Sequence, residues 1–179
     1  GGTGTTSQIS PASYTNYFEP FLKDGKDILH VCLSSGITGV INSAMIAKTN
    51  LEEKYPQRKI CIVDSLAASS GYGLLMDKIA DQRDAGLSLG ELEQWILAHR
   101  LEVNHWFFST DLTFYIRGGR ISKTAGFVGG LLNICPLLNV NDEGKLIPRS
   151  KIRTKRKVIA AIVERMKENA ANGADYADK

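Results

Sequence analysis

Several absences narrow the classes of protein to which this sequence of 179 residues can belong. No apolar run approaches the roughly 20 residues of a membrane-spanning helix, and no charged-then-apolar leader opens the chain. We therefore expect a soluble, cytoplasmic protein with no integral membrane segment. The formal charge is only +3, which does not mark the surface as one that binds nucleic acid. The three cysteines form no CxxC pair and lie singly in apolar runs, so we interpret them as reduced core residues.

Sequence motifs of several enzyme classes are also missing. There is no GxGxxG fingerprint for a dinucleotide and no GxSxG turn for a nucleophilic serine. None of His30, His99 and His105 has a cysteine or carboxylate at the spacing of metal ligands. We therefore predict no metal and no cofactor.

Two apolar runs, residues 28–33 and 59–64, predict buried strands, and the segment between them has the apolar spacing of a helix. A strand, a helix and a second strand form a βαβ unit with parallel strands. The fold class predicted is therefore α/β, with a parallel sheet and helices on both faces. The apolar positions that indicate the connecting helix are Ile37, Ile41, Met45 and Ile46.

Ser34, Ser35 and Gly36 fall at the junction between the first strand and this helix. A serine there can cap the helix, and the free N–H groups of the first turn suit a carboxylate or a phosphate. The plainer interpretation is a capped helix without a ligand, and the motif alone favours it. The second strand ends at Asp64, and the carboxyl ends of parallel strands open onto one edge of the sheet. We therefore expect residues 34–36 and the loop 64–73 to line one crevice.

Other helix signals are clear. Ser10 followed by Pro11 predicts a helix start, and Gly25 predicts its end. Ser88 and Glu91 have the spacing of a capping box. We also expect a helix over residues 74–85 after the loop, and a third strand over 103–109.

The later part of the chain carries a second polar signal. Arg117 and Arg120 flank a glycine pair and are either surface charges on a turn or part of an anion site. After them we expect a helix of small residues from about Ser122, a strand from Ile134 to Val140, and a hairpin. The basic run 151–157 is expected at the start of a helix, where it is either a solvated face or a docking site for a partner.

Four segments together resemble the DegV family in order and spacing. They are TTSQIS at 5–10, LSSGITG at 33–39, VDS at 63–65 with the later SSGYG at 69–73, and YIRGGRIS at 115–122. The DegV family comprises the fatty-acid-binding subunits of bacterial fatty acid kinases. The resemblance implies a carrier and not an enzyme: one long-chain fatty acid is held, and a separate kinase phosphorylates its carboxylate to an acyl phosphate for phospholipid metabolism.

The resemblance also implies roles for individual residues. Those expected at the fatty acid carboxylate are Thr6, Ser7, Ser34, Ser35 and Gly36. Those expected in the wall around the acyl tail are Ala125, Phe127, Val128, Leu131, Leu132 and Ile134. Those expected to dock the kinase are Arg117, Arg120, Arg153 and Arg156.

The chain departs from the family pattern in three respects. Ile9 stands where the family usually has proline, members are longer at both ends, and a histidine of the later region has no counterpart here. We therefore expect a truncated chain, with a first α/β domain over residues 1–110 that lacks its opening strand. Residues 111–179 are expected to begin a second α/β domain.

Two alternatives belong to other classes. One is a serine-dependent hydrolase or transferase with Ser34 or Ser35 as nucleophile, although no histidine is placed as its base. The other is a docking module for nucleic acid or protein built on the basic run 151–157, whose binding would weaken steeply with salt.

Overall fold

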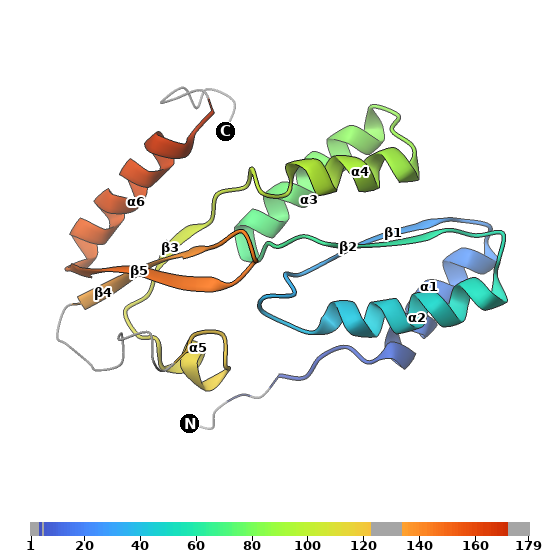
Figure 1. The fold of residues 1–179 in the computed structure, drawn as a ribbon, viewed down its shortest axis with the longest axis horizontal. Coiled ribbons are helices and arrows are strands. Elements are labelled where there is room, and N and C mark those ends of the chain that lie inside the picture. Colours follow the sequence, from blue (N-terminus) through green and yellow to red (C-terminus); the bar gives the residue numbers. More distant parts are fainter. Residues whose placement is uncertain (1–3, 5, 123–133, 172–179) are drawn as a thin grey trace. The chain divides into compact units, whose positions relative to one another are not determined.

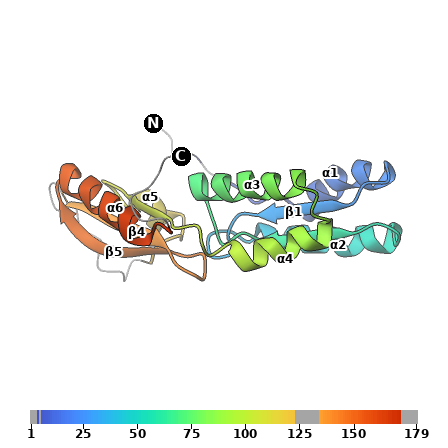
Figure 2. The same cartoon turned by 90° about the horizontal axis from the view of Figure 1, so that it is seen from above.

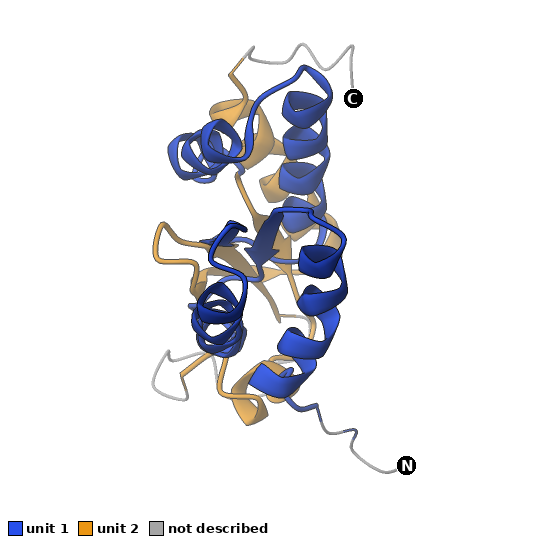
Figure 3. Ribbon diagram, turned by 90° about the vertical axis from the view of Figure 1, so that its right-hand side faces the viewer, with its two compact units in different colours: residues 1–103 blue, residues 104–179 orange. Residues whose placement is uncertain are grey.

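The structure is a computed structural model that describes residues 4, 6–122 and 134–171. The chain divides into two compact units, residues 1–103 and 104–179 (Figure 3). This division falls earlier in the chain than residue 110, where the sequence placed the end of the first domain. Each unit has its own sheet and its own clusters of buried side chains.

The first unit is built on two parallel strands, β1 (Ile28–Cys32) and β2 (Ile60–Asp64). They pair in register, and the intervening helix α2 (Val40–Lys54) completes the predicted βαβ unit. The described residues of this unit also form the helices α1 (Pro11–Lys23), α2 (Val40–Lys54), α3 (Ser69–Asp84) and α4 (Leu89–His99).

Helices cover both faces of this sheet, as predicted (Figures 1 and 2). Successive side chains of a strand point to opposite faces, so each strand contributes to two cores. Cys32 and Ile60 pack against α1 and α2. Val31 and Val63 pack against α3 and α4. Both faces of the short parallel pair are therefore buried.

The helix boundaries predicted at Ser10, Gly25 and Ser88 are confirmed. The side chain of Ser10 accepts a hydrogen bond from the Ser13 N–H at the start of α1. Ser88 and Glu91 form the complete capping box of α4. Gly25 follows α1, and its φ of +77° is a backbone conformation that glycine adopts without steric cost.

The start and the buried face of α2 differ from the prediction. The helix begins at Val40, several residues after Gly36, and its N-cap is Gly39 without a side-chain bond. Met45 and Ile46, expected in the apolar face, are 43% and 52% exposed. The buried positions are instead offset along the helix, and two of them are alanines, because the helix packs closely on α1 and the sheet. These buried residues are Ala44, Ala47 and Leu51.

The helix α3 also begins earlier than expected. Ser69 is its first residue and Ala68 its N-cap, so the serine and glycine stretch 69–73, predicted as loop, forms the first turns. Serine and glycine have modest helix propensity, and tertiary packing overrides it here. The burial of Leu75 and Ile79 against the sheet supplies that packing.

The second unit holds an antiparallel sheet in the order β3 (Trp106–Phe108), β4 (Ile134–Val140) and β5 (Leu146–Arg153). The predicted strand 103–109 is represented by β3, which pairs with β4 and so belongs to this sheet. The predicted hairpin is confirmed, but β5 extends through residues 151–153, so the basic run only partly precedes a helix. The elements are β3 (Trp106–Phe108), α5 (Thr113–Arg117), β4 (Ile134–Val140), β5 (Leu146–Arg153) and α6 (Lys155–Asn169).

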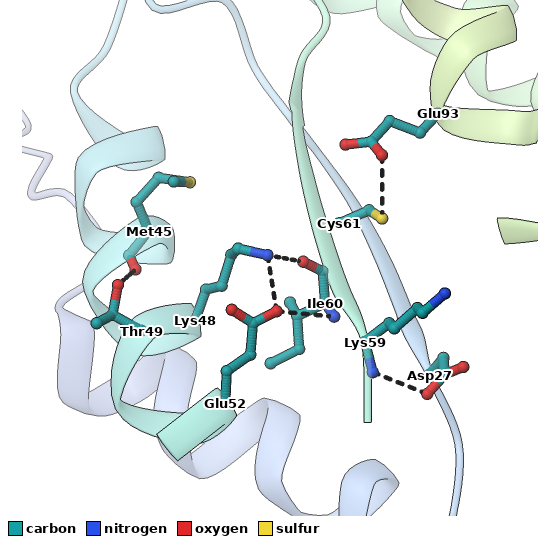
Figure 4. A network of polar contacts seen from close by, with 9 residues as sticks. All are labelled: Asp27, Met45, Lys48, Thr49, Glu52, Lys59, Ile60, Cys61 and Glu93. Carbon is teal, nitrogen blue, oxygen red and sulfur yellow. Dashed lines mark hydrogen bonds and ion pairs between the residues drawn. The ribbon is translucent and has the colours of Figure 1, made fainter. Parts of the chain in front are cut away.

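Side chains bond the outer edge of β2 (Figure 4). The Lys48 ammonium donates to the Ile60 carbonyl, and the Ile60 N–H donates to the Glu52 carboxylate at 3.4 Å. Lys48 and Glu52 also form an ion pair at 2.8 Å. On the other face, the Cys61 thiol donates to Glu93 of α4 at 3.4 Å. The strand is therefore held to α2 and α4 by polar contacts as well as by packing.

Candidate functional site

The two loops that follow β1 and β2 lie side by side, as predicted. The register pairs Cys32 with Asp64, and the pairing continues beyond both strands. The Ser65 N–H donates to the Cys32 carbonyl at 3.1 Å, and the Ser34 N–H donates to the Ala67 carbonyl at 3.0 Å. The sequence motifs LSSGITG and VDS therefore meet at one edge of the parallel sheet.

Ser34 is part of the framework of this edge. Its side chain is fully buried, and its Oγ accepts the Gly36 N–H at 3.1 Å. Its carbonyl accepts the N–H groups of Ile37 and Thr38 at 3.0 and 3.1 Å. These bonds close a tight turn before α2 begins. The prediction that a serine here caps the helix is therefore wrong, because the turn separates Ser34 from the first turn of the helix.

Ser35 has the opposite character, because it is exposed. Its backbone N–H donates to both carboxylate oxygens of Asp64, at 3.2 and 3.3 Å. The amides of Ser35 and Gly36, expected to be free for an anion, are thus used within the protein. What Ser35 presents to solvent is its hydroxyl group.

The motif TTSQIS reaches the same region through Gln8. A Cβ atom on Gly39 would lie 3.0 Å from Nε2 and 3.1 Å from Oε1 of Gln8, so the carboxamide packs on the glycine. Gly39 is the N-cap of α2, just after the turn that contains Ser35. Thr6 and Ser7, which precede Gln8, are both exposed. Two of the predicted groups of head-group residues therefore lie at the same end of α2.

Three further residues support the edge. Ser65 is fully buried, and its Oγ bonds both the carbonyl and the N–H of Ala67, at 3.3 and 3.0 Å. Arg100, the C-cap of α4, donates from Nη1 to the Asp64 carbonyl at 2.7 Å. Asp64 had a signal in the sequence, a carboxylate at the end of a buried strand. Arg100 had none, because only the fold brings the end of α4 to this edge.

The residues predicted for the acyl tail fall mainly outside the part of the chain that the structure describes. Ile134 is described, and it is the half-buried first residue of β4, opposite Arg153 of β5. The predicted helix from about Ser122 also runs into residues that are not described. The others that lie outside the described residues are Ala125, Phe127, Val128, Leu131 and Leu132.

The four arginines predicted for docking are exposed residues of the second unit. Arg117 ends α5, and its guanidinium lies 6.0 Å from the ring centroid of Phe114, which is 67% exposed. Arg120 donates to the carbonyl of Gly118. Arg153 is the last residue of β5 and Arg156 lies in the first turn of α6. They occupy two different parts of this unit.

Two of the histidines have environments that explain them without catalysis. The His30 ring packs against the rings of Tyr14 and Phe18, with centroids 5.1 and 5.2 Å away. Burial lowers the pKa of His30. His99 pairs with Glu102 at 2.8 Å on the surface of the first unit. Neither environment supports the hydrolase alternative. In the described part of the chain, each helix is too short or too polar for a membrane span, and no three His, Cys, Asp or Glu side chains are grouped as ligands of a metal ion.

The first unit is thus a parallel α/β domain with a polar edge made by loops after adjacent strands. Residues 1–177 match the model of the DegV family, a family of uncharacterised proteins. The chain therefore belongs to the DegV family. It is 36% identical to a DegV domain-containing protein of Clostridium perfringens, over 94% of this chain and 58% of the relative. It is 38% identical to one of Lactococcus lactis, with the same coverage.

Solved structures show the same fold. A DegV lipid-binding protein from Thermotoga maritima is 26% identical, with a TM-score of 0.81 over 96% of this chain and 58% of that one. The fatty acid kinase (Fak) B3 protein of Streptococcus pneumoniae, solved with linoleic acid, is 31% identical. Its TM-score is 0.81, over 90% of this chain and 56% of that one. The chain therefore spans a little more than half the length of these relatives.

Proposed function

We propose that this chain is part of a cytoplasmic protein that binds one long-chain fatty acid and presents its carboxylate to a partner kinase. The kinase would phosphorylate the carboxylate to an acyl phosphate, so the chain acts as a carrier without a cofactor of its own. The observation that carries the proposal is the polar edge of the parallel sheet, formed by family motifs that meet in the fold. The Streptococcus pneumoniae relative bears the name of a fatty acid kinase protein and was solved with linoleic acid, which supports the same ligand here.

The head group would be held by hydroxyl groups. The amides of Ser35 and Gly36 are already bonded within the protein, whereas the exposed Ser35 hydroxyl is a donor that suits a carboxylate. Thr6 and Ser7 would contribute further hydroxyls, because Gln8 holds their segment against Gly39. Ser34, fully buried, would shape the turn and not touch the ligand.

The acyl tail would supply most of the binding free energy. Burial of one methylene contributes about 0.8 kcal/mol, so a long tail outweighs a few hydrogen bonds. We propose the apolar residues between Ala125 and Ile134 as part of its wall. The polar end would then set the orientation of the ligand, which decides whether the carboxylate reaches the kinase.

The exposed arginines would serve association with the kinase. Arg117, Arg120, Arg153 and Arg156 present positive charge on the second unit. Positive charge on a docking surface speeds encounter with an acidic partner. It would also attract the acyl phosphate product.

The first test is native mass spectrometry of the full-length protein, followed by organic extraction. One co-purifying fatty acid per chain is the expected result. A ligand-free mass that does not change after incubation with long-chain fatty acids would overturn the proposal.

A variant test addresses the hydroxyl groups. Ser35→Ala combined with Thr6→Ala should weaken fatty acid binding about tenfold, since each lost hydrogen bond costs roughly 0.5–1.5 kcal/mol. Titration with a fluorescent fatty acid measures this effect, and a fatty alcohol with the same tail should lose less. Thr49→Ala is the matched control, because the Thr49 hydroxyl bonds the Met45 carbonyl of its own helix (Figure 4). Equal affinities for the double variant and the control would contradict the head-group assignment.

A further inference from the structure

One carboxylate joins the two loops at the polar edge. Asp64 Oδ1 accepts the N–H of Ser35 at 3.2 Å and the N–H of Leu66 at 2.9 Å. The first bond crosses from the loop after β2 to the loop after β1. The second stays within its own loop. The side chain of Asp64 therefore fixes the backbone at both positions at once.

The loop after β2 has a backbone that needs such support. Leu66 has a φ of +51°, and Ser69, where the loop ends and α3 begins, has a φ of +52°; both conformations cost free energy for residues other than glycine. The Leu66 N–H bond to Asp64 and the Ser65 bonds to Ala67 hold this loop in place. The backbone of Asp64 is also held, because Arg100 Nη1 donates a hydrogen bond to the Asp64 carbonyl at 2.7 Å. Asp64 is thus fixed from α4 and can itself act as a rigid anchor.

From these contacts we propose that Asp64 is a positioning residue that acts through Ser35. By holding the Ser35 N–H, it sets the backbone at Ser35 so that the hydroxyl group is presented to the carboxylate of the ligand. This role rests on the proposed function, in which the Ser35 hydroxyl contacts the fatty acid. The contacts of the Asp64 carboxylate with the backbone N–H groups of Ser35 and Leu66 are the basis of this role.

The chain offers a matched control at the other end of the same two strands. Asp27 Oδ1 accepts the N–H of Lys59 at 2.9 Å, so it also joins the two chain segments through a backbone amide (Figure 4). It lies before β1 and β2, away from the polar edge. Asp27→Ala should therefore lower stability without changing how the protein distinguishes head groups.

The experiment measures the affinities of the full-length protein for oleic acid and for oleyl alcohol, which share a tail and differ in the head group. Asp64→Ala should weaken oleic acid binding by about three- to tenfold and affect oleyl alcohol less. Asp64→Asn should restore most of the loss, because one amide oxygen can accept both N–H groups. With Ser35 already changed to Ala, Asp64→Ala should add little, since Asp64 acts through that residue.

Several results would contradict the positioning role of Asp64. Equal losses for the acid and the alcohol, losses of Asp64→Ala and Ser35→Ala that multiply, or an Asp64→Asn variant as weak as Asp64→Ala would each overturn the positioning role. Tighter binding of oleic acid by Asp64→Ala would also overturn it. Asp64→Ser, whose shorter side chain cannot reach the Ser35 amide, replaces Asp64→Ala if the latter does not fold.

A second measurement separates this proposal from the proposed function. Amide hydrogen exchange without ligand should be about tenfold faster at Ser35 and Leu66 in Asp64→Ala. The Ser34 amide, bonded to the Ala67 carbonyl, is the internal reference. Failure of the wild-type protein to bind either ligand would overturn the proposed function, and with it the role toward a head group. Unchanged exchange at Ser35 would overturn the positioning role alone.

Discussion

His30 lies on β1, and its ring packs against two aromatic side chains of α1, Tyr14 and Phe18. Its Nε2 is buried and has no hydrogen-bond partner among the residues that the structure describes. Burial disfavours the protonated ring, which lowers the pKa of His30 below its ordinary value of 6.5. The unfolded chain keeps the ordinary value, so the two states bind protons differently in mildly acidic solution.

This difference predicts a loss of stability in mild acid. Below pH 6.5 the unfolded chain takes up a proton that the folded protein resists, so the free energy of unfolding falls as the pH falls. His30→Gln, which stays neutral, should reduce this dependence. Urea unfolding at about pH 7.5 and about pH 5.5 measures it, because both lie above the range where carboxylates titrate. Equal pH dependence in the two proteins would contradict the prediction.

At the scale of single residues, the sequence predicted where the polar edge lies but not the role of each side chain in it. Ser34 and Ser35 are adjacent and chemically identical, and only the fold shows that one is buried and the other exposed. The strand-end position of Asp64 was visible in the sequence. Its bond to Ser35 was not, because a side-chain acceptor and a ligand compete for the same amide and a motif does not say which prevails.

At the scale of elements, α4 offers a direct test of a predicted boundary. Ser88 accepts the Glu91 N–H at 3.4 Å, and Glu91 accepts the Ser88 N–H at 2.8 Å. Ser88→Ala should lower the free energy of unfolding by about 1 kcal/mol, because an N–H group of the first turn loses its acceptor. Chemical denaturation measures the change. Ser70→Ala is the control, since Ser70 is exposed inside α3 and caps no helix. A similar loss in both variants would argue against a specific capping effect.

Elements with strong local signals were predicted well from the sequence. The strands β1, β2 and β4 are short apolar runs, and α1 and α4 have capping residues, so their bounds follow from local chemistry. The start of α2 was predicted too early, because Ser34 closes a turn that no apolar pattern reveals. The helix α5 is only one turn long and was not predicted, because so short a helix has no periodicity to detect.

At the scale of the whole molecule, each cluster of buried side chains described lies within one unit. Leu138 of β4 and Ile96 of α4 are both fully buried, in the second and the first unit respectively. Separate cores predict that damage to one is felt mainly in its own sheet. Substitutions of Leu138 and Ile96 therefore make a matched comparison between the two units.

Leu138→Ala should cost about 2–5 kcal/mol and speed amide exchange in β3, β4 and β5, with little effect on β1 and β2. Ile96→Ala should give the reverse pattern. Hydrogen exchange monitored by mass spectrometry distinguishes the two. Equal acceleration in both sheets for either variant would show that the units unfold as one.

The assignment of β3 to the second unit was the hardest feature of the fold to predict from the sequence. Residues 103–109 follow the first unit directly in the chain, yet β3 pairs with β4, which begins at Ile134. Strand pairing between distant segments depends on complementary faces and on closing a long loop, and neither is encoded locally. The parallel pair, joined by a single helix, required no such information.

The side chains that bond the outer edge of β2 have a consequence for self-association. An unpaired strand edge is a template on which another molecule can add a strand and begin an aggregate. At Ile60 both backbone groups that would receive such a strand are occupied by Lys48 and Glu52, and the Asp64 carbonyl is occupied by Arg100. An incoming strand would have to displace the Lys48–Glu52 ion pair and the Arg100 guanidinium. The side chains that connect β2 to α2 and α4 therefore also oppose the addition of a strand at Ile60 and Asp64.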